Sequence, residues 1–254
     1  MLRILGNFAA VMTAALLLPT GIAFSAESAH WSYSGRTGPA QWGSMEEEYK
    51  TCATGKLQSP IDIRDDVAKR AGLPPIRFDY QPSVLKIIDN GHTVQIDYDP
   101  GSFITAGEKR YELVLFHFHK PSEEKLNGKS YPMVAHLVHK APDGKLGVIA
   151  VLLSTGNANP LIDTLWKKLP KKKETESIVN GVKINVADLL PKDRGYYTFA
   201  GSLTTPPCSE NVTWFVLKHP TSVSTDEVAR FSRLYPMNAR PIQPLNGREV
   251  KASN

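Results

Sequence analysis

The chain is poor in cysteine and has no strong excess of either charge. Its two cysteines, Cys52 and Cys208, lie far apart among 254 residues, which argues against a cysteine-based metal motif. Thirty Lys and Arg residues against 25 Asp and Glu give a net charge of +5, spread along the chain. The one basic run, "KKLPKKKE" at 167–174, is typical of a solvated loop or helix end, and no nucleic-acid motif accompanies it. Nucleic acid is therefore not an expected partner.

Long hydrophobic runs are also scarce, and the only candidate lies at the N-terminus. An early arginine precedes an apolar run from about Phe8 to Leu18, and small residues follow. This pattern predicts a signal peptide over residues 1–25, cleaved after Ser25 or, as a second choice, after Ala26. An uncleaved anchor is the alternative, but Pro19 and Gly21 interrupt a run already short for a membrane span. We expect an exported protein, periplasmic or secreted, with no stable membrane anchor and one domain over residues 26–254.

Export changes the interpretation of the two cysteines. An even number of cysteines in an oxidising compartment favours a disulfide. Because the bond would close a very long loop, the chain-entropy model predicts a stabilisation of about 4–5 kcal/mol. A catalytic or metal-binding thiol is the alternative.

The rest of the chain has no internal repeat and is rich in strand-like runs. These runs are rich in Val, Ile, Tyr and Phe and are bounded by turn residues. They cover residues 75–81, 84–91, 92–99, 110–120, 133–142, 146–156 and 212–220. Helical spacing occurs at 159–170, where Asn159 is the expected cap, and at 224–235, where Ser224 or Thr225 precedes acidic residues. The pattern predicts a predominantly β (α+β) single domain with short peripheral helices.

Histidines are placed on the predicted strands in a pattern that suggests a metal site. His117 and His119 lie two residues apart, so both project from the same face of their strand. His136 lies in the next predicted strand, which can bring it beside the pair. His139 is three residues further on and points to the opposite face. Three imidazoles on neighbouring strands are typical of a catalytic zinc site, which keeps one position for water. The alternative is that each histidine is a hydrogen-bonded core residue.

Further motifs carry a family resemblance. "LQSPIDI" at 57–63, "NGH" at 90–92, "FHFHKPSE" at 116–123, "AHLVH" at 135–139 and "GSLTTPPCSENVTWFVLK" at 201–218 together resemble the α-class carbonic anhydrases. The resemblance runs in consistent order from His30 to Ser253. It implies a large twisted, mostly antiparallel sheet with the metal in a conical cleft. It also implies a disulfide between Cys52 and Cys208, as in bacterial members.

The resemblance implies a lyase that converts carbon dioxide reversibly to bicarbonate and a proton. His117, His119 and His136 match the zinc ligands of the family, which is itself a standard example of how zinc lowers the pKa of a bound water. Thr204 matches the gatekeeper that accepts a hydrogen bond from the zinc-bound hydroxide and donates one to a carboxylate, here Glu123.

Other matched residues concern the substrate and the proton path. His92 matches the histidine that shuttles protons to buffer, a role that suits a group titrating near neutrality. Tyr33 matches a tyrosine that orders the water chain, and Thr205 lines the substrate site. The apolar wall for carbon dioxide is matched by Val138, Val148, Leu203, Val212 and Trp214.

Three positions depart from the family pattern. Zinc-bound imidazoles usually donate their second N–H to an acceptor, which the family supplies two residues before the first and third ligands. Here those positions are Leu115, before His117, and Val134, before His136, and neither can accept a hydrogen bond. Glu124 adds a further negative charge beside the gating carboxylate. We therefore expect weaker zinc binding or slower turnover than in a member with both acceptors.

Two other functions are compatible with the sequence. One is a carbonic-anhydrase-like binding or structural module whose zinc binding and catalysis are weakened by Leu115 and Val134. The other is an ester hydrolase using the same metal site, although the apolar cleft has no evident acyl-recognition group. The expected partner is a small-molecule substrate, and the sequence is compatible with a dimer.

Overall fold

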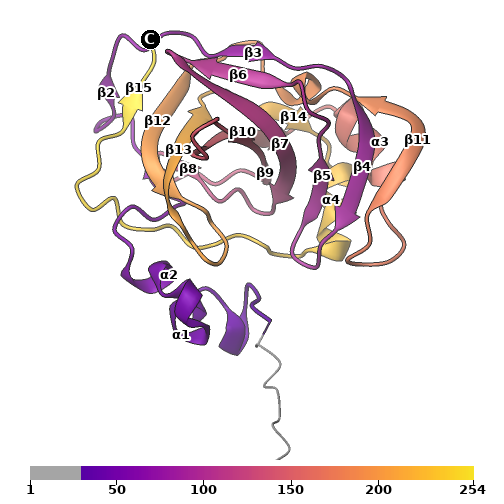
Figure 1. The fold of residues 1–254 in the computed structure, drawn as a ribbon, viewed down its shortest axis with the longest axis horizontal. Coiled ribbons are helices and arrows are strands. Elements are labelled where there is room, and N and C mark those ends of the chain that lie inside the picture. Colours follow the sequence, from indigo (N-terminus) through magenta and orange to yellow (C-terminus); the bar gives the residue numbers. More distant parts are fainter. Residues whose placement is uncertain (1–29) are drawn as a thin grey trace, which may run out of the picture.

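One large, strongly curved sheet makes up most of the molecule (Figure 1). The computed structural model describes residues 30–254, so the predicted signal peptide lies outside the described residues. The sheet has 13 strands, ordered β11-β4-β5-β7-β9-β10-β13-β12-β15-β2, with β3, β6 and β14 paired off this path. A separate two-stranded sheet pairs β1 with β8. No helix in the described part of the chain is long and apolar enough to cross a membrane.

The elements have the following bounds. The strands are β1 (Asp62–Ile63), β2 (Lys69–Arg70), β3 (Arg77–Asp79), β4 (Ser83–Asp89), β5 (Val94–Asp97), β6 (Phe103–Ala106), β7 (Lys109–His119), β8 (Lys125–Leu126), β9 (Met133–Lys140), β10 (Leu146–Thr155), β11 (Ser177–Ile184), β12 (Tyr196–Ser202), β13 (Glu210–Leu217), β14 (Thr221–Val223) and β15 (Lys251–Ala252). The α-helices are α1 (Trp42–Met45), α2 (Thr51–Thr54), α3 (Pro160–Lys167) and α4 (Thr225–Leu234), and short 3-10 helices cover Gly35–Thr37, Glu47–Tyr49 and Val186–Leu189.

The predicted fold class is confirmed. Most strand pairs are antiparallel, while β13 and β14 run parallel to β10 and β2 runs parallel to β15. The structure adds three strands of four or more residues to those predicted, namely β6, β11 and β12. β11 is an edge strand with half of its residues exposed, so its composition lacks the apolar alternation of the inner strands. The predicted helix caps are present, since Asn159 caps α3 and Ser224 forms a capping box with Glu227 at the start of α4.

The alternation of side chains along β7 separates the core from the site. Phe116 and Phe118 are fully buried on one face, where Phe118 packs against Trp166 of α3 and Phe231 of α4. The histidines between and after them therefore project from the other face of the strand. A second buried cluster, which includes residues of β9, β10, β12 and β13, lies on the same side of the sheet as the histidines.

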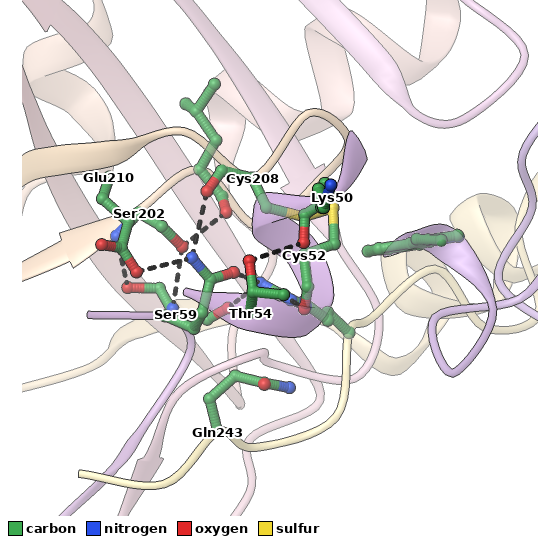
Figure 2. Close-up of a disulfide and its surroundings, with 12 residues drawn as sticks. Lys50, Cys52, Thr54, Ser59, Ser202, Cys208, Glu210 and Gln243 are labelled. Carbon is green, nitrogen blue, oxygen red and sulfur yellow. Dashed lines mark hydrogen bonds between the residues drawn. A yellow bond between two sulfur atoms is a disulfide. The ribbon is translucent and has the colours of Figure 1, made fainter. Parts of the chain in front are cut away.

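The predicted disulfide is present and joins α2 to the loop before β13 (Figure 2). Cys52 and Cys208 are 156 residues apart, and α1 and α2 lie outside the curved sheet (Figure 1). Gln58 Nε2 donates to the Cys208 carbonyl at 3.1 Å, and the Cys208 amide donates to the Thr205 carbonyl at 2.8 Å. The disulfide therefore fixes the N-terminal segment to the loop that carries Thr204 and Thr205.

Removing the disulfide is expected to cost stability. Because it closes a loop of 156 residues, the Cys52→Ser/Cys208→Ser variant should lose about 5 kcal/mol of the free energy of unfolding, measured by urea titration. The wild type unfolded under reducing conditions is the control and should match the variant. A loss below about 1 kcal/mol would contradict the entropic role of this bond.

Candidate metal centre

The register of β7 and β9 brings three histidines together. His117 lies directly opposite His136 in the antiparallel pair, and His119 follows two residues later on the same face. The ring centroids of His117 and His119 are 4.9 Å apart, those of His117 and His136 5.5 Å, and those of His119 and His136 4.7 Å. One nitrogen from each ring lies within 4.8 Å of the others. The cluster predicted from the sequence is therefore present. His139 lies on the far face, as expected, with its ring nitrogen 2.8 Å from the Tyr80 hydroxyl.

The free nitrogen atoms of the cluster fit a metal ion. His119 Nδ1 lies 2.7 Å from the carbonyl oxygen of Asn238, to which it donates as a neutral imidazole. Its Nε2 is buried and has no hydrogen-bond partner among the described residues. A buried polar atom without a partner is costly unless something else satisfies it. Three imidazole nitrogens facing one point are a donor set that zinc prefers.

The pKa values of two of the imidazoles favour the neutral form that a metal requires. Burial lowers the pKa of His117 to about 3, and His136 beside it adds to the effect. Burial likewise lowers the pKa of His119 well below its usual range. Burial also acts to lower the pKa of His136, but the carboxylates of Glu124 and Glu123 outweigh it, so this pKa is raised.

Glu123 is a buried carboxylate on the inner side of the cluster. The amide of Arg240 donates to its Oε1 at 2.7 Å, and its Oε2 makes no hydrogen bond among the described residues. Burial raises its pKa to about 7, an effect opposed by His136, reinforced by Glu124, and reduced again by the Arg240 amide and the Thr204 hydroxyl. The predicted partners Thr204 and Glu123 are therefore neighbours, both almost fully buried.

Glu124 changes the expectation for His136. Both of its carboxylate oxygens lie near His136 Nε2, at 3.1 Å for Oε1 and 3.2 Å for Oε2. The valine side chain at position 134 cannot accept a hydrogen bond, but His136 nevertheless has an acceptor in the carboxylate of Glu124. The expected loss of an acceptor therefore does not hold for His136. At His117 the side chain of Leu115 offers no acceptor, so weaker zinc binding through this ligand stays a prediction.

A cavity of about 220 Å³ opens beside the histidines. Of the predicted substrate wall, Val138, Leu203 and Thr205 line this cavity. Val148, Val212 and Trp214 lie instead in the buried cluster behind it, with the Trp214 ring 4.9 Å from that of His136. The complete lining is Trp31, Tyr33, Asn90, His92, Thr93, Gln95, Leu115, His117, His119, Val138, Leu203 and Thr205.

His92 lies in the cavity wall, stacked on an indole. Its ring is parallel to that of Trp31, with centroids 3.5 Å apart and an interplanar angle of 5°. The His30 ring lies 4.7 Å away and the Tyr33 ring 6.5 Å away. Burial, followed by His30 and Lys173, lowers the pKa of His92 to about 4. In this position His92 is less basic than a shuttle group working near neutral pH should be.

Three residues that support the site were not predicted from the sequence. The carbonyl of Asn238 contacts His119, the amide of Arg240 contacts Glu123, and Trp31 covers His92. A contact through a backbone atom carries no requirement for a residue type, so no sequence signal indicated the first two. Trp31 lies in an aromatic segment whose packing partner is set only by the tertiary fold.

The fold and the histidine cluster define a single-domain β protein with three imidazoles that could hold a metal ion, and comparisons with known proteins identify its family. Residues 37–254 match the model of the eukaryotic-type carbonic anhydrase family. A carbonic anhydrase of Pectobacterium carotovorum is 41% identical over 241 residues, covering 94% of this chain and 98% of the relative. One from Nostoc sp. is 39% identical over 228 residues, covering 89% and 86%.

Solved structures agree with this result. The α-carbonic anhydrase of Thermovibrio ammonificans, solved with the inhibitor sulfanilamide, has a TM-score of 0.85 and 40% identity, covering 87% of this chain and 98% of that one. Dioscorin complexed with ascorbate has a TM-score of 0.82 and 31% identity, covering 88% and 97%. The chain belongs to the carbonic anhydrase family, whose reaction is the hydration of carbon dioxide.

The side chain of Asn238 is expected to stabilise the site region. It is fully buried, accepts from the Lys120 amide at 2.7 Å, and donates to the carbonyls of His92 and Phe118 at 3.0 Å each. Asn238→Ala leaves the Lys120 amide and the His92 carbonyl without these partners, while the Phe118 carbonyl still accepts from the Thr93 hydroxyl, so the free energy of unfolding should fall by about 2–3 kcal/mol in urea titrations. Gln243→Ala, which removes a single exposed side-chain hydrogen bond, is the control. Equal stability of the two variants would contradict this role.

Proposed function

We propose that the chain hydrates carbon dioxide reversibly to bicarbonate with a zinc ion held by His117, His119 and His136. The observation that carries the proposal is the convergence of the three imidazoles on one point, with a buried and unpartnered Nε2 on His119. Zinc held there would act as a Lewis acid and would lower the pKa of a water molecule bound to it to about 7, for which carbonic anhydrase is the usual example. The alternative of a binding module without metal is not favoured, because all three ligands are present and adjacent.

Thr204 and Glu123 orient the attacking group. Glu123 in its ionised form can only accept hydrogen bonds, and the Arg240 amide already occupies one of its oxygens. The remaining oxygen is available to accept from the Thr204 hydroxyl. The Thr204 hydroxyl then has only lone pairs to offer on its other side, so it accepts a hydrogen bond from the nucleophile, and this orients a lone pair of the nucleophile toward the substrate.

The substrate pocket suits a small apolar molecule. Val138 and Leu203 form an apolar part of the wall beside His117 and His119, and Thr205 adds one hydroxyl. Carbon dioxide has no charge and weak hydrogen-bonding capacity, so it loses little by leaving water for such a wall. Bicarbonate is charged and is better solvated outside, which favours its release.

His92 is the proposed proton shuttle between the cavity and buffer. It lies in the cavity wall, half-buried, with the Tyr33 ring nearby. In the stack on Trp31 its pKa of about 4 favours the neutral, accepting form. We infer that Trp31 sets how readily His92 takes up a proton.

We also infer that the domain works in an oxidising compartment, outside the cytoplasm. Its two cysteines pair with each other, leaving no free thiol among the described residues. Such a bond persists where thiols are not kept reduced, as in the periplasm or after secretion.

Metal analysis and stopped-flow carbon dioxide hydration test the proposal together. The wild type should hold one zinc per chain and be active. His117→Ala should lose both zinc and activity, because two imidazoles leave the site incomplete. Thr204→Ala should keep its zinc and lose about 10–100-fold in activity, while Thr204→Ser, which retains the hydroxyl, should stay near the wild type. A zinc-free, inactive wild type would overturn the proposal and favour the binding module.

The stack on Trp31 should control the pKa of His92. Trp31→Ala exposes the imidazole to water, which favours its charged form, so the pKa should rise from about 4 toward its ordinary value of 6.5. The pH dependence of the His92 ring resonances in NMR spectra measures this shift directly. Trp31→Phe, which keeps an aromatic ring, should show a smaller rise. An unchanged pKa in the alanine variant would show that stacking does not set the basicity of His92.

A further inference from the structure

We propose that Glu124 is the positioning residue for His136, so that the carboxylate serving this ligand has moved from β9 to the segment just before β8. The inference rests on the proposed zinc site and extends it to a residue that the family pattern does not use in this way. It begins with the placement of the carboxylate, whose two oxygens lie 3.1 and 3.2 Å from His136 Nε2.

This contact decides which nitrogen of His136 faces the cluster. A neutral imidazole has one N–H and one lone pair, and an ionised carboxylate can only accept. The proton must therefore be on Nε2, where Glu124 accepts it. The lone pair is then left on Nδ1, which lies on the other side of the ring, 3.9 Å from Glu123 Oε2. Glu124 thus holds His136 in the tautomer whose free nitrogen faces the other two histidines.

The burial of Glu124 argues against a merely structural role. The residue is fully buried, and a buried carboxylate is costly unless it is paired. Among the described residues, His136 Nε2 is the one polar group within hydrogen-bonding distance of its side-chain oxygens. Within residues 30–254, no backbone amide and no lysine or arginine side chain donates to this carboxylate. Its contribution therefore passes through the imidazole of His136.

Val134 occupies the position on β9 from which the family supplies the acceptor for the third ligand. It lies two residues before His136 on the same face of β9 and is fully buried in an apolar cluster with Leu126 and Leu152. Its side chain cannot accept a hydrogen bond from His136. An acidic residue at 124 and an apolar one at 134 are therefore complementary, and together they leave His136 with one carboxylate.

The backbone at Glu124 is held firmly enough for positioning. Ser122 Oγ donates to the Glu124 carbonyl at 2.8 Å and accepts from the Tyr131 amide at 2.9 Å. The next residue, Lys125, pairs with Asp62 in the small β1–β8 sheet. Two segments far apart in sequence therefore fix the carboxylate beside the ring.

Zinc retention with a rescue variant tests the proposal. Glu124→Leu removes the acceptor, so zinc affinity, measured by competition with a chelating dye, should fall by about 10–100-fold. Adding Val134→Glu to Glu124→Leu restores a carboxylate from β9 and should recover most of the affinity. Val134→Glu alone, with Glu124 in place, should bring no gain. Glu108→Leu, which removes an exposed carboxylate, is the control and should bind zinc as the wild type does.

A second readout reports on the ligand itself. The visible spectrum of the cobalt(II)-loaded protein should change in Glu124→Leu and return in the double variant, which loss of packing alone would not produce. Glu124→Gln keeps the size of the side chain, so it tests the same point if the leucine variant does not fold, and its affinity should fall as well.

The outcomes separate the two proposals. Wild-type zinc affinity in both Glu124→Leu and Glu124→Gln, with an active zinc-bound wild type, would overturn the role of Glu124 and leave the proposed function intact. The role of Glu124 would also be overturned if adding Val134→Glu to a folded Glu124→Leu protein failed to restore its zinc affinity. A wild type that binds no zinc would overturn both.

Discussion

The antiparallel pairing of β7 with β9 is the constraint on which the site depends. It sets His117 opposite His136 and leaves His119 two residues away on the same face. Side chains alternate along a strand, so a slip of one residue would turn the histidines into the core and the phenylalanines toward the cleft. The burial of Phe116 and Phe118, with Phe118 packed against helices α3 and α4, opposes such a slip. The same apolar packing that stabilises the sheet therefore also fixes the metal ligands.

Two adjacent buried carboxylates, Glu123 and Glu124, are the main electrostatic cost of this arrangement. They serve different groups. Glu123 accepts from the Arg240 amide and faces Thr204, whereas Glu124 accepts from the Nε2 of His136. Like charges this close repel, and burial adds to the cost of both. A divalent cation bound among the neighbouring imidazoles would offset that cost, which couples metal binding to the stability of the cleft.

Segments from distant parts of the chain complete the site. The stretch around Asn238 closes over β7, with its carbonyl on His119 and its side chain on the backbone of His92 and Phe118. The disulfide ties the N-terminal segment to the loop that carries Thr204. This N-terminal segment also brings Trp31 onto His92, so the environment of the proposed shuttle depends on a part of the chain outside the sheet. The residues proposed for metal binding, nucleophile orientation and proton transfer are thus held by different long-range contacts.

The sequence by itself determined the β-rich class, the two helix caps, the disulfide pair and the three histidines, because each depends on local spacing or on a family motif. It also indicated that Leu115, Val134 and Glu124 depart from the family pattern, but it treated Glu124 only as an added charge. Tertiary structure alone decided that this carboxylate lies beside His136 and replaces the missing acceptor at Val134. It likewise decided the backbone contacts of Asn238 with His119 and of Arg240 with Glu123, and the burial that lowers the pKa of His92. The physical reason is that hydrogen bonding and desolvation depend on the distances between atoms in the folded protein. For residues far apart in the sequence, the sequence does not specify those distances.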